Sequence, residues 1–241
     1  MKRIALLVIP LLLFSACKKN TFTIEGTFEN GADKTIYLCI VTPRDGEKEV
    51  TTMTLDDKGH FKLREQLEYL TFYNLHVNEN DYVMLLPHPG EHLTLTGNYN
   101  DLTHSYDVKG SPESTLLWLL QDYSNKGSQA LADLVKKNKE NKASLSPEEY
   151  QDAKKATDTV FMEIRNQQVN YMENFIYDNK GSLTTLIALY KPFNDHLLLP
   201  PQSCYELYTI VLEGLQDQLP NNPHTINFKN TAIAVENEYA N

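Results

Sequence analysis

Short apolar runs that partly alternate with polar residues fill the chain between Thr21 and Ser111. They are rich in β-branched and aromatic residues, and Asp-Gly, Asn-Asp and Pro-Gly turns separate them, which is typical of strands. The clearest runs are Phe22–Gly26, Ile36–Val41, Phe72–Val77 and Leu93–Thr96. Many short strands joined by such turns indicate an antiparallel β-sandwich or open barrel. We therefore expect a β-domain over residues 17–111.

The turn residues predict how these strands connect. Asp56–Gly59 separates Lys48–Leu55 from His60–Leu63, so we expect these two strands to form a hairpin. The later strands are expected to continue as a meander over Phe72–Val77, Tyr82–Leu86 and His92–Gly97. The run Ile36–Val41 is almost wholly apolar, as expected of a central strand.

Beyond Ser111 the apolar period changes from strand-like to helical, which predicts a helical region over residues 112–241. Pro112–Tyr123 carries leucines at helical spacing, and Ser128 is expected to start a further stretch of helix. Lys136–Lys142 is a run of charged and polar residues that we expect to be a solvated helix end and loop. The fold class predicted for the whole chain is α+β.

Ser146 begins the longest helix predicted in this region, because it combines an N-cap serine, a proline at the first helical position and Glu149 at the third. An apolar stripe then continues for about eight turns. Its members are Ala153, Thr157, Val160, Ile164, Tyr171 and Phe175. Further helices are predicted over residues 182–190, over 202–219 and around Phe228. We expect these stripes to pack on one another and on the nearest sheet edge; a partner protein bound to the helical region is the alternative.

The start of the chain has the pattern of a secretion signal. Two basic residues precede the apolar segment Ile4–Phe14, and Ser15-Ala16 supplies small residues for cleavage, so residues 1–16 are expected to be a signal peptide. Cleavage before Cys17 resembles processing at the bacterial lipobox, in which the cysteine is acylated through its sulfur, for example with palmitate, and anchors the mature protein. The resemblance implies a lipoprotein on the periplasmic face of the outer membrane. An ordinary cleaved signal is the alternative.

The charge balance argues against one class of partner. The formal net charge is −10 at pH 7, and no basic stripe is present, so we expect no nucleic-acid partner. No apolar run after Phe14 reaches 18 residues, so no further membrane span is predicted. The expected partners are the membrane, through the lipid on Cys17, and a protein on the helical region.

The order of the motifs in the β-domain resembles that of a known family. The motifs are Phe22-x-Ile24-x-Gly26, Ile36-Tyr37-Leu38, Asp57-x-Gly59-x-Phe61, Phe72-Tyr73-x-Leu75, a Pro-Gly before Leu93-x-Leu95, and Val108-x-Gly110-Ser111. With them, residues 20 to about 115 resemble an uncharacterised N-terminal domain of lipoprotein thiol-disulfide oxidoreductases of the thioredoxin-like family. In that family a helical segment and then a thioredoxin domain with Cys-x-x-Cys follow.

The sequence itself contains no Cys-x-x-Cys, which leaves two hypotheses. The first is a non-catalytic binding or scaffold module of a membrane-anchored lipoprotein. The alternative is an accessory part of a thiol-disulfide oxidoreductase whose thioredoxin domain is missing or supplied in trans. We expect no catalytic residue and no cofactor, because neither a nucleophile elbow nor a glycine-rich phosphate loop is present.

His88, Glu91 and His92 are the candidate metal ligands that the sequence offers, because imidazole and carboxylate groups bind zinc or copper. Pro89-Gly90 makes this segment a turn, so the two rings need not converge, and the spacing fixes no further ligand. We therefore expect no metal site. The other histidines are isolated in the sequence and are expected to be surface or core residues; they are His60, His76, His104, His196 and His224.

Cys39 and Cys204 are the two thiols left after Cys17. One lies in an expected strand and the other near the start of an expected helix, and both a disulfide between them and two unpaired buried thiols fit the sequence. Neither has a histidine nearby in sequence. Asp158-Thr159-Val160 resembles a short motif for O-glycosylation on Thr159, inside an expected helix.

Overall fold

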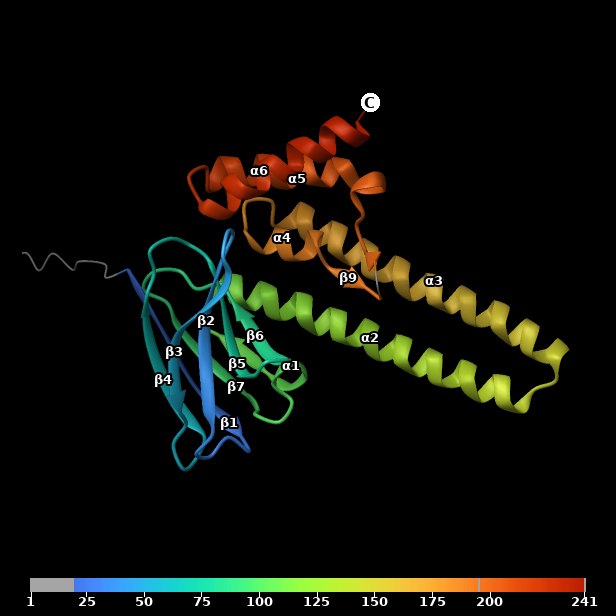
Figure 1. Ribbon diagram of the computed structural model, residues 1–241, viewed down its shortest axis with the longest axis horizontal. Coiled ribbons are helices and arrows are strands. Elements are labelled where there is room, and N and C mark those ends of the chain that lie inside the picture. Colours follow the sequence, from blue (N-terminus) through green and yellow to red (C-terminus); the bar gives the residue numbers. More distant parts are fainter. Residues whose placement is uncertain (1–19, 195, 241) are drawn as a thin grey trace, which may run out of the picture.

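The computed structural model describes residues 20–194 and 196–240, and it confirms the α+β fold. Two facing sheets form the N-terminal region, and the helices follow them in the chain (Figure 1). The first sheet has the order β4-β1-β7-β8, with bounds His60–Gln66, Thr21–Glu29, His92–Asn98 and Asp107–Lys109. The second has the order β3-β2-β5-β6, with bounds Gly46–Thr54, Thr35–Thr42, Phe72–Asn78 and Asp81–Leu85. The sheets do not close on each other, so the domain is an open sandwich.

The core of the sandwich lies between the inner faces of the two sheets. Phe22, Ile24 and Phe28 of β1 are buried there because alternate residues of a strand share one face. Gly26 has the same parity, but a Cβ at this position would lie 2.1 Å from the carbonyl oxygen of Leu95 on β7. The glycine therefore allows β1 and β7 to approach closely.

Two of the expected strand connections are wrong. The strand that follows Asp56–Gly59 does not return along β3; β4 pairs with β1 in the first sheet, while β3 pairs with β2 in the second. Likewise β7 leaves the meander and runs parallel to β1. The same turn residues join two strands of one sheet or carry the chain between two sheets, so turn chemistry alone does not fix strand pairing. The predicted central strand is confirmed, because β2 lies between β3 and β5.

Helix α2 runs from Pro112 to Ser144 without a break. The predicted restart at Ser128 is therefore wrong, and so is the predicted loop over Lys136–Lys142, because that segment is helical. Lysine and glutamate have high helix propensity, and the segment contains no proline or glycine. Polar pairs one turn apart also support this helix; Gln129 Nε2 donates to Asp133 Oδ1 at 3.0 Å.

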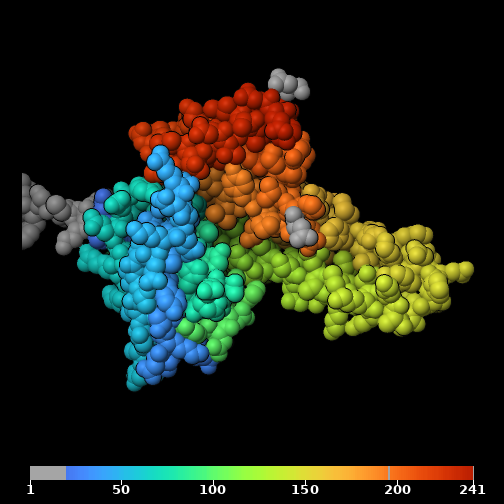
Figure 2. Space-filling view, viewed as in Figure 1, coloured from blue at the N-terminus to red at the C-terminus, as the bar shows by residue number. Residues whose placement is uncertain are grey.

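Helices α2 and α3 (Pro147–Asp178) form an antiparallel hairpin that projects from the body of the molecule (Figures 1 and 2). The predicted helix start is confirmed, since Ser146 and Glu149 form a reciprocal capping box. The predicted stripe is wrong at Val160, which is 39% exposed. In this outer half of the hairpin, α3 packs only against α2, and two paired helices bury only a narrow stripe of each other's surface.

Among the remaining elements, the helices lie at one end of the sandwich, and the short strands lie beside α3 (Figure 1). They are α4 (Thr184–Leu189), the short β9 (Pro192–Phe193) and β10 (His196–Leu197), α5 (Pro201–Gln218) and α6 (Pro223–Tyr239); α1 (Leu102–Ser105) belongs to the sandwich. The helical stripes pack on one another, as expected, and their shared cluster includes Phe72 of the second sheet and Leu86, which directly follows β6. The helical region and the sandwich therefore share buried surface.

Residues 1–16 and Cys17, for which a signal peptide and a lipid are expected, lie outside the described residues. Within residues 20–194 and 196–240, none of the helices combines the length and the apolar character needed to cross a membrane.

Candidate functional site

A cleft of about 650 Å³ lies between the second sheet and the helices. Such a volume is in the usual range for small-molecule sites. The end of β2 and strand β6 form one side, and α2, the end of α4 and α6 form the other; the surface is hollowed where these elements meet (Figure 2). The lining includes Val41, Met84, Leu117, Ile187, Tyr190 and Phe228.

The walls of this cleft are mainly apolar and aromatic. Phe72, Leu120 and Phe228 belong to the buried helical cluster and also line the cleft. Tyr190 makes edge contacts with Tyr208 and Phe228 at ring-centroid distances of 6.2 and 6.3 Å. Edge-to-face contacts of this kind stabilise the packing of the wall.

Lys191 brings a cation into this apolar surrounding. It lies two residues after the end of α4, and removal of its ammonium from water lowers the pKa of the side chain. Its Nζ donates to Gln121 Oε1 at 3.2 Å. Across residues 20–194 and 196–240, no carboxylate oxygen lies within 4.0 Å of this nitrogen. The Lys191 ammonium therefore has a neutral acceptor but no counter-ion in the described part of the chain.

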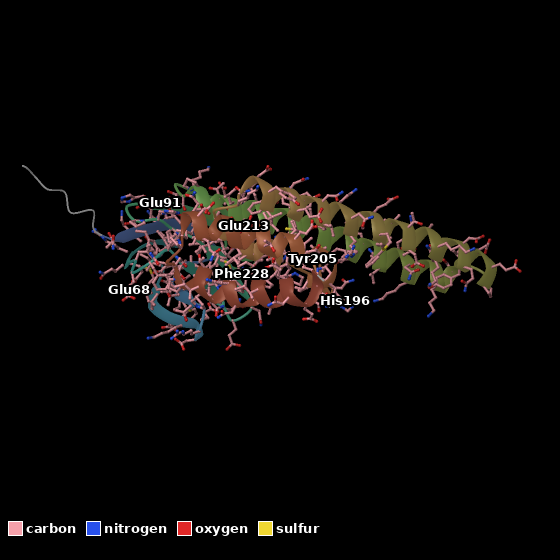
Figure 3. All side chains as sticks on the ribbon, turned by 90° about the horizontal axis from the view of Figure 1, so that it is seen from above. Glu68, Glu91, His196, Tyr205, Glu213 and Phe228 are labelled. Atoms are coloured by element: carbon pink, nitrogen blue, oxygen red, sulfur yellow. The ribbon has the colours of Figure 1, made fainter. Side chains whose placement is uncertain are left out.

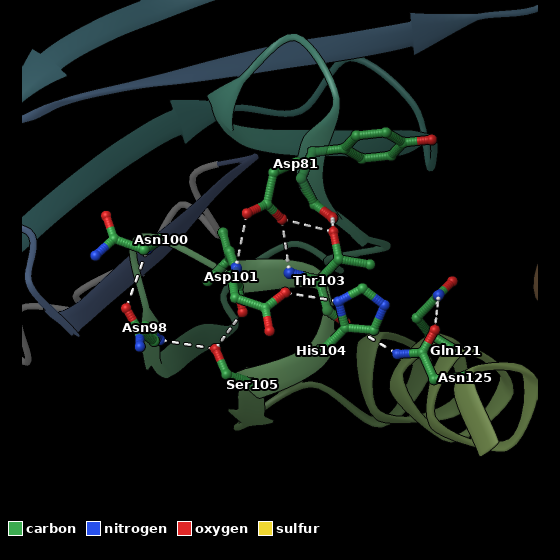
Figure 4. A network of polar contacts seen from close by, with 11 residues as sticks. Asp81, Asn98, Asn100, Asp101, Thr103, His104, Ser105, Gln121 and Asn125 are labelled. Carbon is green, nitrogen blue, oxygen red and sulfur yellow. Dashed lines mark hydrogen bonds and ion pairs between the residues drawn. The ribbon is translucent and has the colours of Figure 1, made fainter. Parts of the chain in front are cut away.

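A chain of side-chain hydrogen bonds fixes Gln121 in place (Figure 4). Gln121 Nε2 donates to Asn125 Oδ1 at 2.7 Å, and Asn125 Nδ2 donates to the carbonyl of Thr103 at 3.1 Å. Thr103 in turn donates through its backbone N–H and its hydroxyl to Asp81 at the start of β6, both at 2.7 Å. Because the Gln121 amide nitrogen is used in this way, its oxygen faces Lys191. The position of the ammonium is thus tied to the sandwich.

His224, at the start of α6, is the second basic side chain of the lining. Its Nε2 lies 2.7 Å from Thr71 Oγ1, whose hydroxyl donates to the carbonyl of Val41 at 2.7 Å. Since that hydroxyl proton is already used, Nε2 carries a hydrogen and donates to the oxygen. Burial lowers the pKa of His224 to about 4, so the ring is neutral at pH 7. Of the two basic side chains in the lining, Lys191 is therefore the one that can pair with an anion.

The metal ligands considered in the sequence do not converge. Glu91 Oε2 accepts a hydrogen bond from the backbone N–H of His88 at 2.8 Å, which closes the turn, and His92 is exposed at the start of β7. His196, one of the histidines that are isolated in the sequence, also lies well apart from Glu91 (Figure 3). Of the residues whose placement is described, one group of three has its donor atoms within 4.8 Å of one another; it consists of Cys39, Glu47 and His76.

Both cysteines described by the structure are free. Cys39 is half-buried on the outward face of β2 and not in the core of the sandwich, and Cys204 lies at a kink within α5. Burial and the neighbouring Glu47 carboxylate raise the pKa of the Cys39 thiol to about 11. Thr159 is exposed on α3, where its hydroxyl donates to the carbonyl of Lys155 at 3.1 Å.

Sequence reasoning did not find Lys191, His224 or His76 as members of a site. In the sequence, Lys191 is a lysine between a tyrosine and a proline, and no spacing connects it to Gln121. His76 is the cross-strand partner of Tyr37, two residues before Cys39. Knowledge of the register between β2 and β5 is the signal that brings His76 and Cys39 together.

Comparison with known proteins adds one domain assignment. A DUF4369 domain, a domain of unknown function, is found at residues 22–117. The match includes the whole sandwich and the first residues of α2 that pack on it. No curated protein matches the chain, and no solved structure matches it.

Proposed function

We propose that this protein is a non-catalytic binding module whose cleft holds a small amphipathic anion, a molecule with an apolar body and one anionic group. The observation that carries the proposal is Lys191, an ammonium without a described counter-ion in an apolar cleft of about 650 Å³. Lys191 is half-buried, and a charge removed from water is costly unless it is paired; an anionic group on a ligand supplies the pair. The apolar walls fit the rest of such a ligand.

The proposed localisation rests on the sequence at the start of the chain. Cys17 after Ser15-Ala16 supports a lipid anchor, and the protein then acts at the periplasmic face of the outer membrane. A lipid anchor brings the cleft close to a surface from which amphipathic molecules exchange. The link to thioredoxin-like lipoproteins, with the chain as an accessory part of an oxidoreductase, remains the alternative and rests on the motif order in the β-domain.

Calorimetric titration with decanoate and with decan-1-ol, both below the concentration at which they aggregate, tests this function. The two probes share the apolar chain and differ in charge. We expect decanoate to bind more tightly by about 10–100-fold, because a hydrogen bond to a charged group contributes about 1.5–3 kcal/mol. In Lys191→Met, which keeps the apolar stem, we expect the difference between the probes to vanish.

Lys229→Met is the matched control, because Lys229 is exposed on α6 and outside the cleft lining. This variant is expected to prefer decanoate as strongly as the unchanged protein does. Absence of saturable binding for both probes would contradict the proposed function, and an undiminished preference for decanoate in Lys191→Met would contradict the role of Lys191.

A further inference from the structure

Three neighbouring strands of the second sheet place a thiol, an imidazole and a carboxylate on one outward face. Cys39 comes from β2, His76 from β5 and Glu47 from β3, and their donor atoms all lie within 4.8 Å of one another. None of the three residues lines the cleft, although Tyr82, whose ring packs on His76, does. We propose that Cys39, His76 and Glu47 form a site for a single Zn²⁺ ion.

The donor set matches the chemistry of zinc. Zn²⁺ binds thiolate sulfur at about 2.3 Å, imidazole nitrogen at about 2.0–2.1 Å and carboxylate oxygen at about 2.0–2.2 Å. In a tetrahedral site these bond lengths place the donor atoms about 3.3–3.6 Å apart. The observed separations of up to 4.8 Å therefore require movements of about 1 Å, which side-chain rotation supplies. The thiolate and the imidazole favour zinc over calcium and magnesium, which prefer oxygen ligands.

A bulge in β3 selects the carboxylates that face Cys39. Leu38 pairs with Thr51, but Cys39 pairs with Glu49, so the register shifts between them. Without this shift, Val50 would lie opposite Cys39, and a one-residue slip moves every later side chain to the other face. The bulge therefore turns Glu49 and Glu47 toward the face that carries Cys39. Bulges that re-aim side chains are frequent beside functional sites.

The surroundings hold the ligands and leave a position open. His76 is held between Glu47 and the carbonyl of Asn78, which lies 3.2 Å from Nδ1, so Nε2 is the nitrogen that faces Glu47. The centroid of the Tyr82 ring lies 4.7 Å from the centroid of the His76 imidazole ring. Asn74, the cross-strand partner of Cys39, is 5% exposed, and no described residue bonds to its Oδ1. A buried oxygen needs a hydrogen-bond donor. A water molecule bound at the fourth position of the zinc ion would supply such a donor to Asn74 Oδ1.

Metal entry exchanges a proton for the ion. Zinc binds cysteine as the thiolate, so the thiol proton of Cys39 must leave when the ion enters. On binding, the S–H bond is lost, a sulfur–zinc bond forms and the proton passes to the solvent. Glu47 exchanges its contact with His76 for a bond to the ion. No electron is transferred in this step.

The site is tested by adding Co²⁺ to the full chain in which Cys17 is replaced by Ser. A cobalt–thiolate bond gives a charge-transfer absorption that a bond from cobalt to a carboxylate or an imidazole does not give. We expect a single Co²⁺ to bind with this absorption, and we expect Zn²⁺ to displace it. The band should disappear in Cys39→Ala. In His76→Asn and Glu47→Gln the affinity should fall by at least about tenfold, since each variant loses a ligand.

Cys204→Ala and His92→Asn are the matched controls, and both should bind Co²⁺ as the parent does. Glu47 is exposed at a sheet edge, so Glu47→Gln tests the site even if Cys39→Ala folds poorly. Absence of the band in the parent would overturn the proposal. Its persistence in Cys39→Ala, or unchanged affinity in both Glu47→Gln and His76→Asn, would do the same.

Discussion

Lys191 Nζ and Gln121 Oε1 are joined by a hydrogen bond of 3.2 Å, although 70 residues separate them in the chain. The bond connects the end of α4 to α2, and through Asn125 and Thr103 it continues to Asp81 in the sandwich. The cleft therefore has a cation whose position is set before a ligand arrives. Such preorganisation reduces the ordering cost of binding.

The neutral state of His224 predicts a pH dependence of stability. The pKa of this ring is lowered from 6.5 in the unfolded chain to about 4 in the fold. The unfolded state therefore binds the proton first, so the contribution of His224 is fully present above pH 6.5 and is lost as the pH falls to about 4. We expect this fall in pH to lower the free energy of unfolding by up to about 3 kcal/mol through His224.

Urea unfolding between about pH 7 and about pH 4, followed by the fluorescence of Trp118, the sole tryptophan, measures this effect. His224→Gln keeps a donor toward Thr71 but does not titrate, so its stability should depend less on pH. His196→Gln is the control, because His196 is exposed, and it should behave as the parent. An equal pH dependence in His224→Gln and the parent would contradict the account of His224.

The boundary between the sandwich and the helices predicts how fragments behave. Every buried residue of the sandwich cluster lies between Phe22 and Val108, so a fragment of residues 20–111 is expected to fold. Trp118 packs on this cluster, and its Nε1 donates to the carbonyl of Tyr106 at 2.8 Å. Extension to residue 124 should therefore raise the free energy of unfolding by about 2 kcal/mol. Thermal unfolding of both fragments tests this; no cooperative transition in either would show that the remaining helices complete the core.

The described cysteines predict an absence of thiol-disulfide exchange. Exchange needs a thiolate, and the raised pKa of about 11 keeps the Cys39 thiol protonated at neutral pH. We expect insulin reduction by the purified mature chain to match the buffer control, and the double variant Cys39→Ser, Cys204→Ser to behave as the parent. Turnover that either substitution abolishes would favour the oxidoreductase alternative.

The proposed lipid anchor predicts where the protein is found after cell fractionation. Replacing Cys17 by Ala removes the sulfur that is expected to be acylated. We expect the variant to leave the membrane fraction, whereas Cys204→Ala should remain there. Membrane association that survives Cys17→Ala would contradict the lipoprotein proposal.

The strands themselves were predictable because their apolar residues alternate, as at Phe22 and Ile24. Their pairing was not, because Asp56–Gly59 has the residues of a hairpin turn but carries the chain from one sheet to the other. The start of α3 was predictable from Ser146 and Glu149, since a capping box is a local signal. The continuity of α2 was missed because the charged run Lys136–Lys142 was interpreted as a solvated helix end and loop, although lysine and glutamate favour a helix.

The candidate sites were beyond the sequence for a different reason. Each joins residues that are far apart in the chain, as with Lys191 and Gln121, or residues brought together by a bulge, as with Cys39 and Glu47. No period or spacing relates such residues until the register and the helix packing are known. The two histidines around the Pro89-Gly90 turn are close in the sequence, but the turn does not bring their rings together.

Labelling with a decanoate that carries a diazirine at its far end tests the central claim most directly, because it reports where an amphipathic anion binds. After irradiation, peptides from the parts of α2 and α6 that line the cleft should be labelled, and excess decanoate should suppress the labelling. The labelling should be strongly reduced in Lys191→Met and unchanged in Lys229→Met. Labelling confined to the outer part of the α2–α3 hairpin, or equal in Lys191→Met and the parent, would contradict the proposal.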